Sequence, residues 1–113
     1  MDKLIAKLAA LGVPGLVLLI AVSTSGYAGG AAIVAALASL GPGGMIGGIA
    51  TLGLIGLITL AIAEYGVDTL VCALIKKLIS QGESKESILR KIKRFPISRS
   101  LKRKLQEVVS NCC

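Results

Sequence analysis

The sequence predicts an all-α integral membrane protein: a helical hairpin in the bilayer, then an amphipathic helix and a small basic helical hairpin. Of its 113 residues, 54% are hydrophobic and only 17% are charged, whereas soluble domains carry about 25% charged residues. Mean hydropathy is +0.82. No charged residue lies between Lys7 and Glu64, so residues 8–63 form an uncharged run of 56. Because about 20 apolar residues span a bilayer, this run is long enough for two crossings.

Glycine and proline divide the run into three candidate helices, at about 2–23, 29–40 and 45–64. The alanine-rich stretch 31–38 favours helix because alanine is the best helix former. Gly41 suits a C-terminal cap, and Pro42 cannot continue a helix. Residues 45–63 are the best candidate for a spanning helix, whereas the middle segment is too short to cross alone.

The charges predict the orientation of these segments. Lys3 and Lys7 precede the run, and residues 76–104 carry eleven lysines and arginines against two acids, a net charge of +9. Basic residues close to spans favour the cytoplasmic side. We therefore expect a multi-pass protein of the inner (cell) membrane with both termini in the cytoplasm. Two spans with a short middle helix satisfy this rule, and three full crossings remain an alternative.

Beyond the run, apolar residues recur at helical spacing, which predicts an amphipathic helix. Its apolar positions are Val67, Leu70, Val71, Leu74, Ile75 and Leu78. This helix either continues the preceding one past Gly66 or lies along the membrane interface with its lysines near phosphates.

The tail predicts a basic helical hairpin. Ser84 suits the N-cap of a helix over 84–94, Phe95-Pro96 forces a turn, and Ser98 or Ser100 caps a last helix. The apolar residues that we expect to face inward are Ile88, Leu89, Ile92, Leu101, Leu105 and Val108. The predicted regions are thus 1–66 (transmembrane), 67–82 (amphipathic interfacial helix) and 83–113 (basic cytoplasmic tail).

Small residues recur at four-residue spacing within the run. In lipid, such spacing lets helix backbones approach closely. The residues predicted to form packing or oligomerisation faces are Gly43, Gly44, Gly47, Gly48, Ala28, Ala32 and Ala36. We expect a homo-oligomer, since one hairpin has too few helices to enclose a channel. The alternatives are close packing of the chain's own helices and a low-complexity apolar sequence with no specific partner.

Two acids mark the end of the run. Glu64 and Asp68 are four residues apart and would share a face with Cys72 and Lys76 on a continuous helix. In a ring of subunits they could form an acidic collar at a pore mouth. The simpler interpretation, which we favour, is that Glu64 ends the span and Asp68 caps the next helix or pairs with a lysine.

The basic residues predict contact with anionic lipid headgroups or with a soluble regulatory protein. They are Lys76, Lys77, Arg90, Lys91, Lys93, Arg94, Lys102, Arg103 and Lys104. Clusters of this kind beside a span bind anionic lipid. Nucleic acid is disfavoured, because Phe95 is the only aromatic residue of the tail that could stack on a base.

The composition disfavours catalysis and metal binding, so we expect no enzyme, no metal and no cofactor. Histidine is absent, and the three cysteines (Cys72, Cys112 and Cys113) form no CxxC pair. Adjacent terminal cysteines do not readily bridge each other, and an odd count leaves at least one thiol. A reducing, cytoplasm-facing C-terminus therefore fits better than a secreted disulfide scaffold.

The stretches 26–32 and 41–48 resemble Gly/Ala-rich segments of interferon-inducible small membrane proteins and of bacterial effectors that accompany anti-phage defence modules. The architecture is also similar to that of phage holins. The resemblance covers about residues 8–63, rests on composition and transfers no individual residue. It implies membrane perturbation by an oligomer, hence a pore or ion channel with a toxic or antiviral role.

Two further hypotheses belong to other classes. The chain could be a membrane anchor or adaptor that recruits a soluble partner through its basic tail. It could also be a secreted cationic membrane-active peptide, which requires cleavage after Ala28. The break at Pro14-Gly15 argues against a signal peptide.

Overall fold

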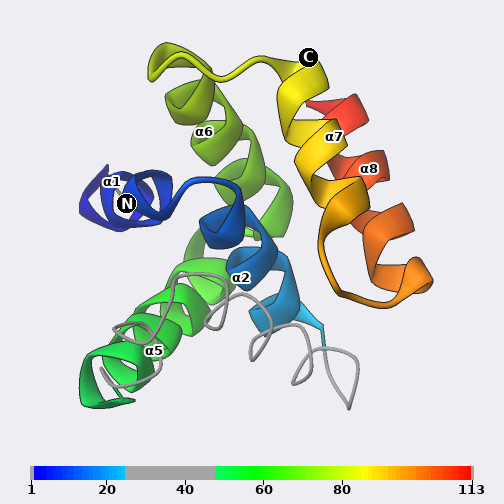
Figure 1. The fold of residues 1–113 in the computed structure, drawn as a ribbon. Coiled ribbons are helices and arrows are strands. Elements are labelled where there is room, and N and C mark those ends of the chain that lie inside the picture. The colour runs from blue at the N-terminus through cyan, green and yellow to red at the C-terminus, as the bar shows by residue number, and fades with distance from the viewer. Residues whose placement is uncertain (1, 25–47, 113) are drawn as a thin grey trace.

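The computed structural model describes residues 2–24 and 48–112, and these residues form six α-helices and no strand (Figure 1). The helices are α1 (Asp2–Leu11), α2 (Val13–Ser23), α5 (Gly48–Tyr65), α6 (Val67–Ser80), α7 (Lys85–Arg94) and α8 (Arg99–Asn111). The all-α prediction is confirmed for this part of the chain. The predicted middle helix at 29–40 lies outside the described residues.

The first predicted helix is broken at Gly12. The expectation of one helix over 2–23 is wrong, because the chain bends by 119° between α1 and α2. Gly12 has φ 77° and ψ −147°, a region that is essentially restricted to glycine. Pro14 lies in the first turn of α2, where its missing N–H costs nothing. The bend brings α1 so close that a Cβ on Gly15 would overlap the carbonyl oxygen of Leu8.

A second bend follows α5 at Gly66. The chain bends by 115° between α5 and α6, and Gly66 has φ 88° and ψ 152°. The alternative in which α6 continues the preceding helix is therefore wrong. The apolar face of α6 is buried in the protein's own core through Leu70, Val71, Leu74, Ile75 and Leu78. The predicted amphipathic helix is confirmed, and its apolar face packs against the protein's own helices.

The basic hairpin forms as predicted. Ser84 caps α7, with its hydroxyl oxygen accepting from the Ser87 N–H at 3.1 Å. Ser98, rather than Ser100, caps α8 by accepting from the Leu101 N–H at 3.3 Å. The buried seam consists of Ile88, Ile92, Leu101, Leu105 and Val109, whereas Leu89 and Val108 are partly buried.

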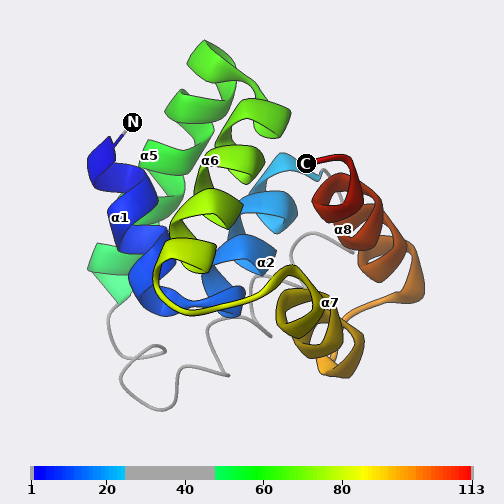
Figure 2. The same cartoon turned by 90° about the horizontal axis from the view of Figure 1, so that it is seen from above.

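Helix α2 lies at the centre of the fold. It contacts α1, α5, α6, α7 and α8, and Figure 2 shows it between α6 and the α7–α8 hairpin. Its residues Val13 and Gly15–Ala21 are all buried. The hydrophobic core includes residues from every described helix, and no charged or polar side chain of the described residues is buried in it. The three regions that the sequence predicts, 1–66, 67–82 and 83–113, therefore share one hydrophobic core.

Candidate functional site

An uncharged helix enclosed by other helices is the first feature with a functional consequence. Helices that are apolar all round are found in the centres of proteins or in membranes, and α2 contains no charged residue. Within residues 2–24 and 48–112, no single helix is both long and apolar enough to cross a bilayer. Two pairs of helices, each joined by a bend, are long and apolar enough when the two members are counted together. They are Lys3–Leu11 with Val13–Ser23, and Ile55–Tyr65 with Val67–Ser80.

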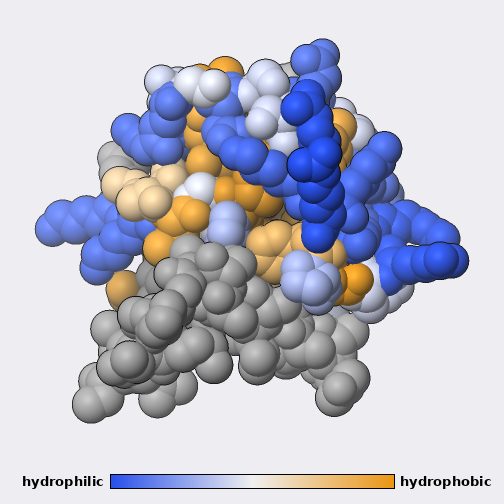
Figure 3. Space-filling view, viewed as in Figure 1, coloured by the Kyte–Doolittle hydropathy of each residue, from blue (hydrophilic) through white to orange (hydrophobic). Residues whose placement is uncertain are grey.

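A basic surface on the α7–α8 hairpin is the second feature. In Figure 3, blue side chains project over this side of the molecule, with apolar surface between them. The exposed basic residues on it are Arg90, Lys91, Lys93, Arg94, Arg99, Arg103 and Lys104, while Lys85 and Lys102 are half-buried. Residues 85–111 carry nine basic and two acidic side chains, a net charge of +7. Lys76 and Lys77 are also exposed, on α6.

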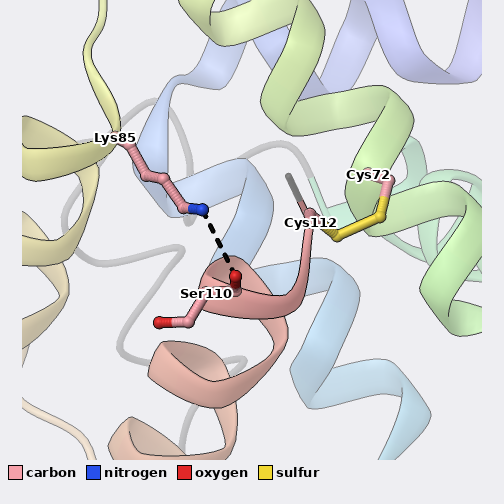
Figure 4. The surroundings of a disulfide bond; sticks show 4 residues. All are labelled: Cys72, Lys85, Ser110 and Cys112. Carbon is pink, nitrogen blue, oxygen red and sulfur yellow. Dashed lines mark hydrogen bonds between the residues drawn. A yellow bond between two sulfur atoms is a disulfide. The ribbon is translucent and has the colours of Figure 1, made fainter.

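The polar contacts of the hairpin are internal. Lys102 donates to the carbonyl oxygen of Lys93 at 2.9 Å, which ties α8 to the end of α7. Lys85 donates to the carbonyl oxygen of Ser110 at 3.3 Å, at the opposite end of the pair (Figure 4). Among the described residues, no hydrogen bond or ion pair joins residues 85–111 to α1, α2, α5 or α6. The hairpin is thus held against these helices by apolar packing and by one covalent bond.

Glu83 anchors the start of the hairpin. Its carboxylate accepts from the Lys91 ammonium at 2.5 Å and from the Ser87 hydroxyl at 2.9 Å. These bonds, led by the one from Lys91, hold the pKa of the Glu83 carboxyl below its ordinary value. The carboxylate is therefore ionised at neutral pH and fixes the first two turns of α7.

The covalent bond is a disulfide between Cys72, in the middle of α6, and Cys112, which caps the C-terminus of α8 (Figure 4). The preference for reduced cysteines is wrong at these two positions. They are 40 residues apart, and in the chain-entropy view a bridge that closes a loop of this length stabilises the fold by about 4 kcal/mol.

A cavity of about 300 Å³ opens beside the disulfide. It is lined by Asp68, Cys72, Glu107, Val108, Asn111 and Cys112. Cys112 is 7% exposed and Cys72 is partly buried, whereas Asp68, Glu107 and Asn111 are exposed. Both cysteines of the bridge thus lie in the wall of a cavity that also carries two carboxylates.

The two predicted collar acids are separated by the bend. Glu64 lies near the end of α5 and Asp68 in the first turn of α6, with Gly66 between them. Their expected shared face on one continuous helix is wrong for this reason. Asp68 and Cys72 do share a face of α6, since both line the cavity. Asp68 also lies in the first turn of α6, where the positive end of the helix dipole favours a negative charge.

The predicted packing residues are mostly beyond the described part of the chain. Ala28, Ala32, Ala36, Gly43, Gly44 and Gly47 lie outside the described residues, and Gly48 begins α5. Two further glycines of α5, Gly53 and Gly56, are exposed with open space around them. They lie on the same side of α5 as Leu57 and Leu60, which are 46% and 68% exposed.

Comparison with known proteins identifies no relative. No protein-family model, no curated protein and no solved structure matches the chain.

Sequence reasoning missed two structural features that bear on the candidate site, namely the Gly12 bend and the Cys72–Cys112 bridge. The bend has a local signal, since Gly12 is followed by a proline two residues later. The disulfide has none, because its two cysteines meet only after α8 folds back onto α6.

Proposed function

We propose that this protein acts on membranes: its apolar helices insert into a bilayer and, as an oligomer, permeabilise or depolarise it. The observation that carries this proposal is α2, an uncharged helix that five other helices cover in the compact fold. A folded body with an apolar helix inside and a basic surface outside suits a protein that approaches a charged membrane and then turns its core outward.

The two glycine bends supply a route for this conversion. If α1 and α2 align, residues 2–23 form a helix about 33 Å long, which matches the hydrocarbon core of roughly 30 Å. A proline at position 14 is compatible with such a span, because membrane helices tolerate proline kinks. Helix α5 already extends for about 27 Å and gains length if α6 aligns with it.

The basic hairpin supplies membrane selectivity and orientation. Each Lys or Arg near an anionic surface contributes about 1 kcal/mol to binding. A surface of this charge favours anionic over zwitterionic lipid and keeps the tail on one side of the bilayer. We propose the cytoplasmic side of the cell membrane, where disulfides are transient or redox-sensing. Following the sequence resemblance, we propose a toxic or defence effector, with no enzymatic activity.

Ion release from liposomes tests the proposal. Purified full-length protein is added to vesicles of anionic lipid and to vesicles of zwitterionic lipid, each loaded with potassium. We expect release from the anionic vesicles at protein concentrations that leave the zwitterionic vesicles intact. A Gly48→Leu variant should release less, because a bulky side chain at the start of α5 hinders close helix packing in an oligomer.

The anchor hypothesis gives a different result in the same assay. An anchor incorporates into the vesicles, as flotation would show, but releases no potassium at any concentration, whether its disulfide is oxidised or reduced. That outcome would contradict permeabilisation and would direct attention to soluble proteins that bind the α7–α8 surface.

A further inference from the structure

We propose that the Cys72–Cys112 disulfide is a redox latch that holds the basic α7–α8 hairpin over the apolar helices, and that its reduction releases them. The consequence at a membrane rests on the proposed function, whereas the opening itself does not. The bond joins the middle of α6 to the end of α8 and is the one covalent tie between the hairpin and the described helices outside the linker at 81–84.

The contacts explain why this single bond matters. The hairpin covers α2 and α6, and it contacts both. The side-chain hydrogen bonds and the ion pair of the hairpin remain within residues 83–111. The polar tie to the body in the described structure lies in the linker, where the Glu83 N–H donates to the carbonyl oxygen of Leu78 in α6 at 3.1 Å. With the disulfide broken, apolar packing and the linker, which contains Gly82 at φ 104°, are what retain it within residues 2–24 and 48–112.

The hairpin's own properties favour its departure. Helices α7 and α8 have 10 and 13 residues, and isolated helices of this length are marginally stable in water. Their net charge of +7 also adds mutual repulsion. Once untied, the hairpin should detach and fray, and the buried faces of α2 and α6 should become accessible.

The chemistry of opening is thiol–disulfide exchange with a dithiol reductant. A thiolate of the reductant attacks one sulfur atom, the Cys72–Cys112 bond breaks, and a mixed disulfide forms. The second thiol of the reductant then displaces the protein sulfur. The protein gains two electrons and two protons as two cysteine thiols, and the reductant becomes a disulfide. Both cysteines line one cavity, and we expect the attacking thiolate to approach the bond from this side.

Hydrogen exchange of the intact protein with and without dithiothreitol tests the latch. We expect amide exchange in residues 85–111 to accelerate at least tenfold on reduction, because a cross-link that closes a loop of this length opposes opening strongly. Exchange in α2 should also rise. Adding reductant to the folded wild-type protein avoids any dependence on folding without the bond.

Two variants sharpen the experiment. Cys112→Ser should exchange rapidly with or without reductant, whereas Cys113→Ser keeps the Cys72–Cys112 pair and should respond as the wild type does. Exchange rates in 85–111 that agree within twofold between oxidised and reduced wild-type protein would overturn the latch.

Potassium release from anionic liposomes, measured on the same samples, separates the two proposals. Faster release after reduction supports both. Faster exchange with no release in either state supports opening and contradicts the proposed function. Equal release from both states, despite faster exchange, overturns the regulatory role of the disulfide.

Discussion

At the scale of single residues, the hydroxyl at the start of α8 shows how much one hydrogen bond contributes. Ser98 and Ser100 both precede the helix or lie in its first turn, and their hydroxyl oxygens are 3.2 Å apart. Only the Ser98 hydroxyl accepts from a backbone N–H, that of Leu101. The helix is short and strongly charged, so its first turn depends on this cap.

We therefore predict that Ser98→Ala lowers the free energy of unfolding by about 1 kcal/mol. Ser100→Ala, the matched control two residues away, should change it by less than about 0.5 kcal/mol. Urea denaturation followed by circular dichroism measures both. Equal losses in the two variants would mean that the second hydroxyl shares the cap.

At the scale of helices, the two glycine bends determine whether the apolar segments are compact or extended. Each bend joins two helices of one apolar pair, and both glycines adopt backbone angles that other residues rarely reach. Neither position is sterically crowded, since an added Cβ meets nothing closer than 3.8 Å at Gly12 and nothing within 4 Å at Gly66. Alanine at either position therefore acts through backbone conformation.

Gly12→Ala and Gly66→Ala should each destabilise the compact fold by about 1–3 kcal/mol, because alanine is strained at these angles. An extended helix gains about 1 kcal/mol from the same change. Both effects favour insertion, so potassium release should begin at lower protein concentration. Gly53→Ala is the control: it lies within a helix with open space around it, and it should leave the bends unchanged. Lower release from the two bend variants than from wild type would contradict the hinge role.

Some helices of the fold are predictable from local sequence, whereas the Gly66 bend and the disulfide depend on tertiary contacts. Ser84, Phe95-Pro96 and the apolar spacing of the tail are local signals, and the helices they predict are present. The bend at Gly12 has a local signal in Pro14, whereas whether Gly66 bends or continues a helix depends on what packs on either side, which local sequence does not contain. The pairing of Cys72 with Cys112 depends on the return of α8 to α6, so it follows from the tertiary fold alone.

At the scale of the whole molecule, charge is separated from apolar surface. The core contains no charged side chain among the described residues, and the basic residues gather on the hairpin. Of these, Arg90, Arg94 and Arg103 are exposed and take part in no hydrogen bond or ion pair within the described structure. Their removal should therefore affect membrane binding far more than folding.

The triple variant Arg90→Gln, Arg94→Gln and Arg103→Gln should bind anionic vesicles roughly a hundredfold more weakly, since three charges each contribute about 1 kcal/mol. Its unfolding free energy should stay within about 1 kcal/mol of wild type. Vesicle sedimentation at two salt concentrations provides the measurement, and higher salt should reduce the difference between the proteins. Unchanged binding would assign the basic surface to a protein partner.

The enclosure of α2 has a consequence for how this protein tolerates change. Helices α6, α7 and α8 each have a face exposed to solvent. Along them, the positions that tolerate a polar substitution should therefore recur about every 3.6 residues. Helix α2 has no outer face from Gly15 to Ala21. A saturation scan of folding across these seven positions should therefore show no periodicity, with polar side chains rejected at every one.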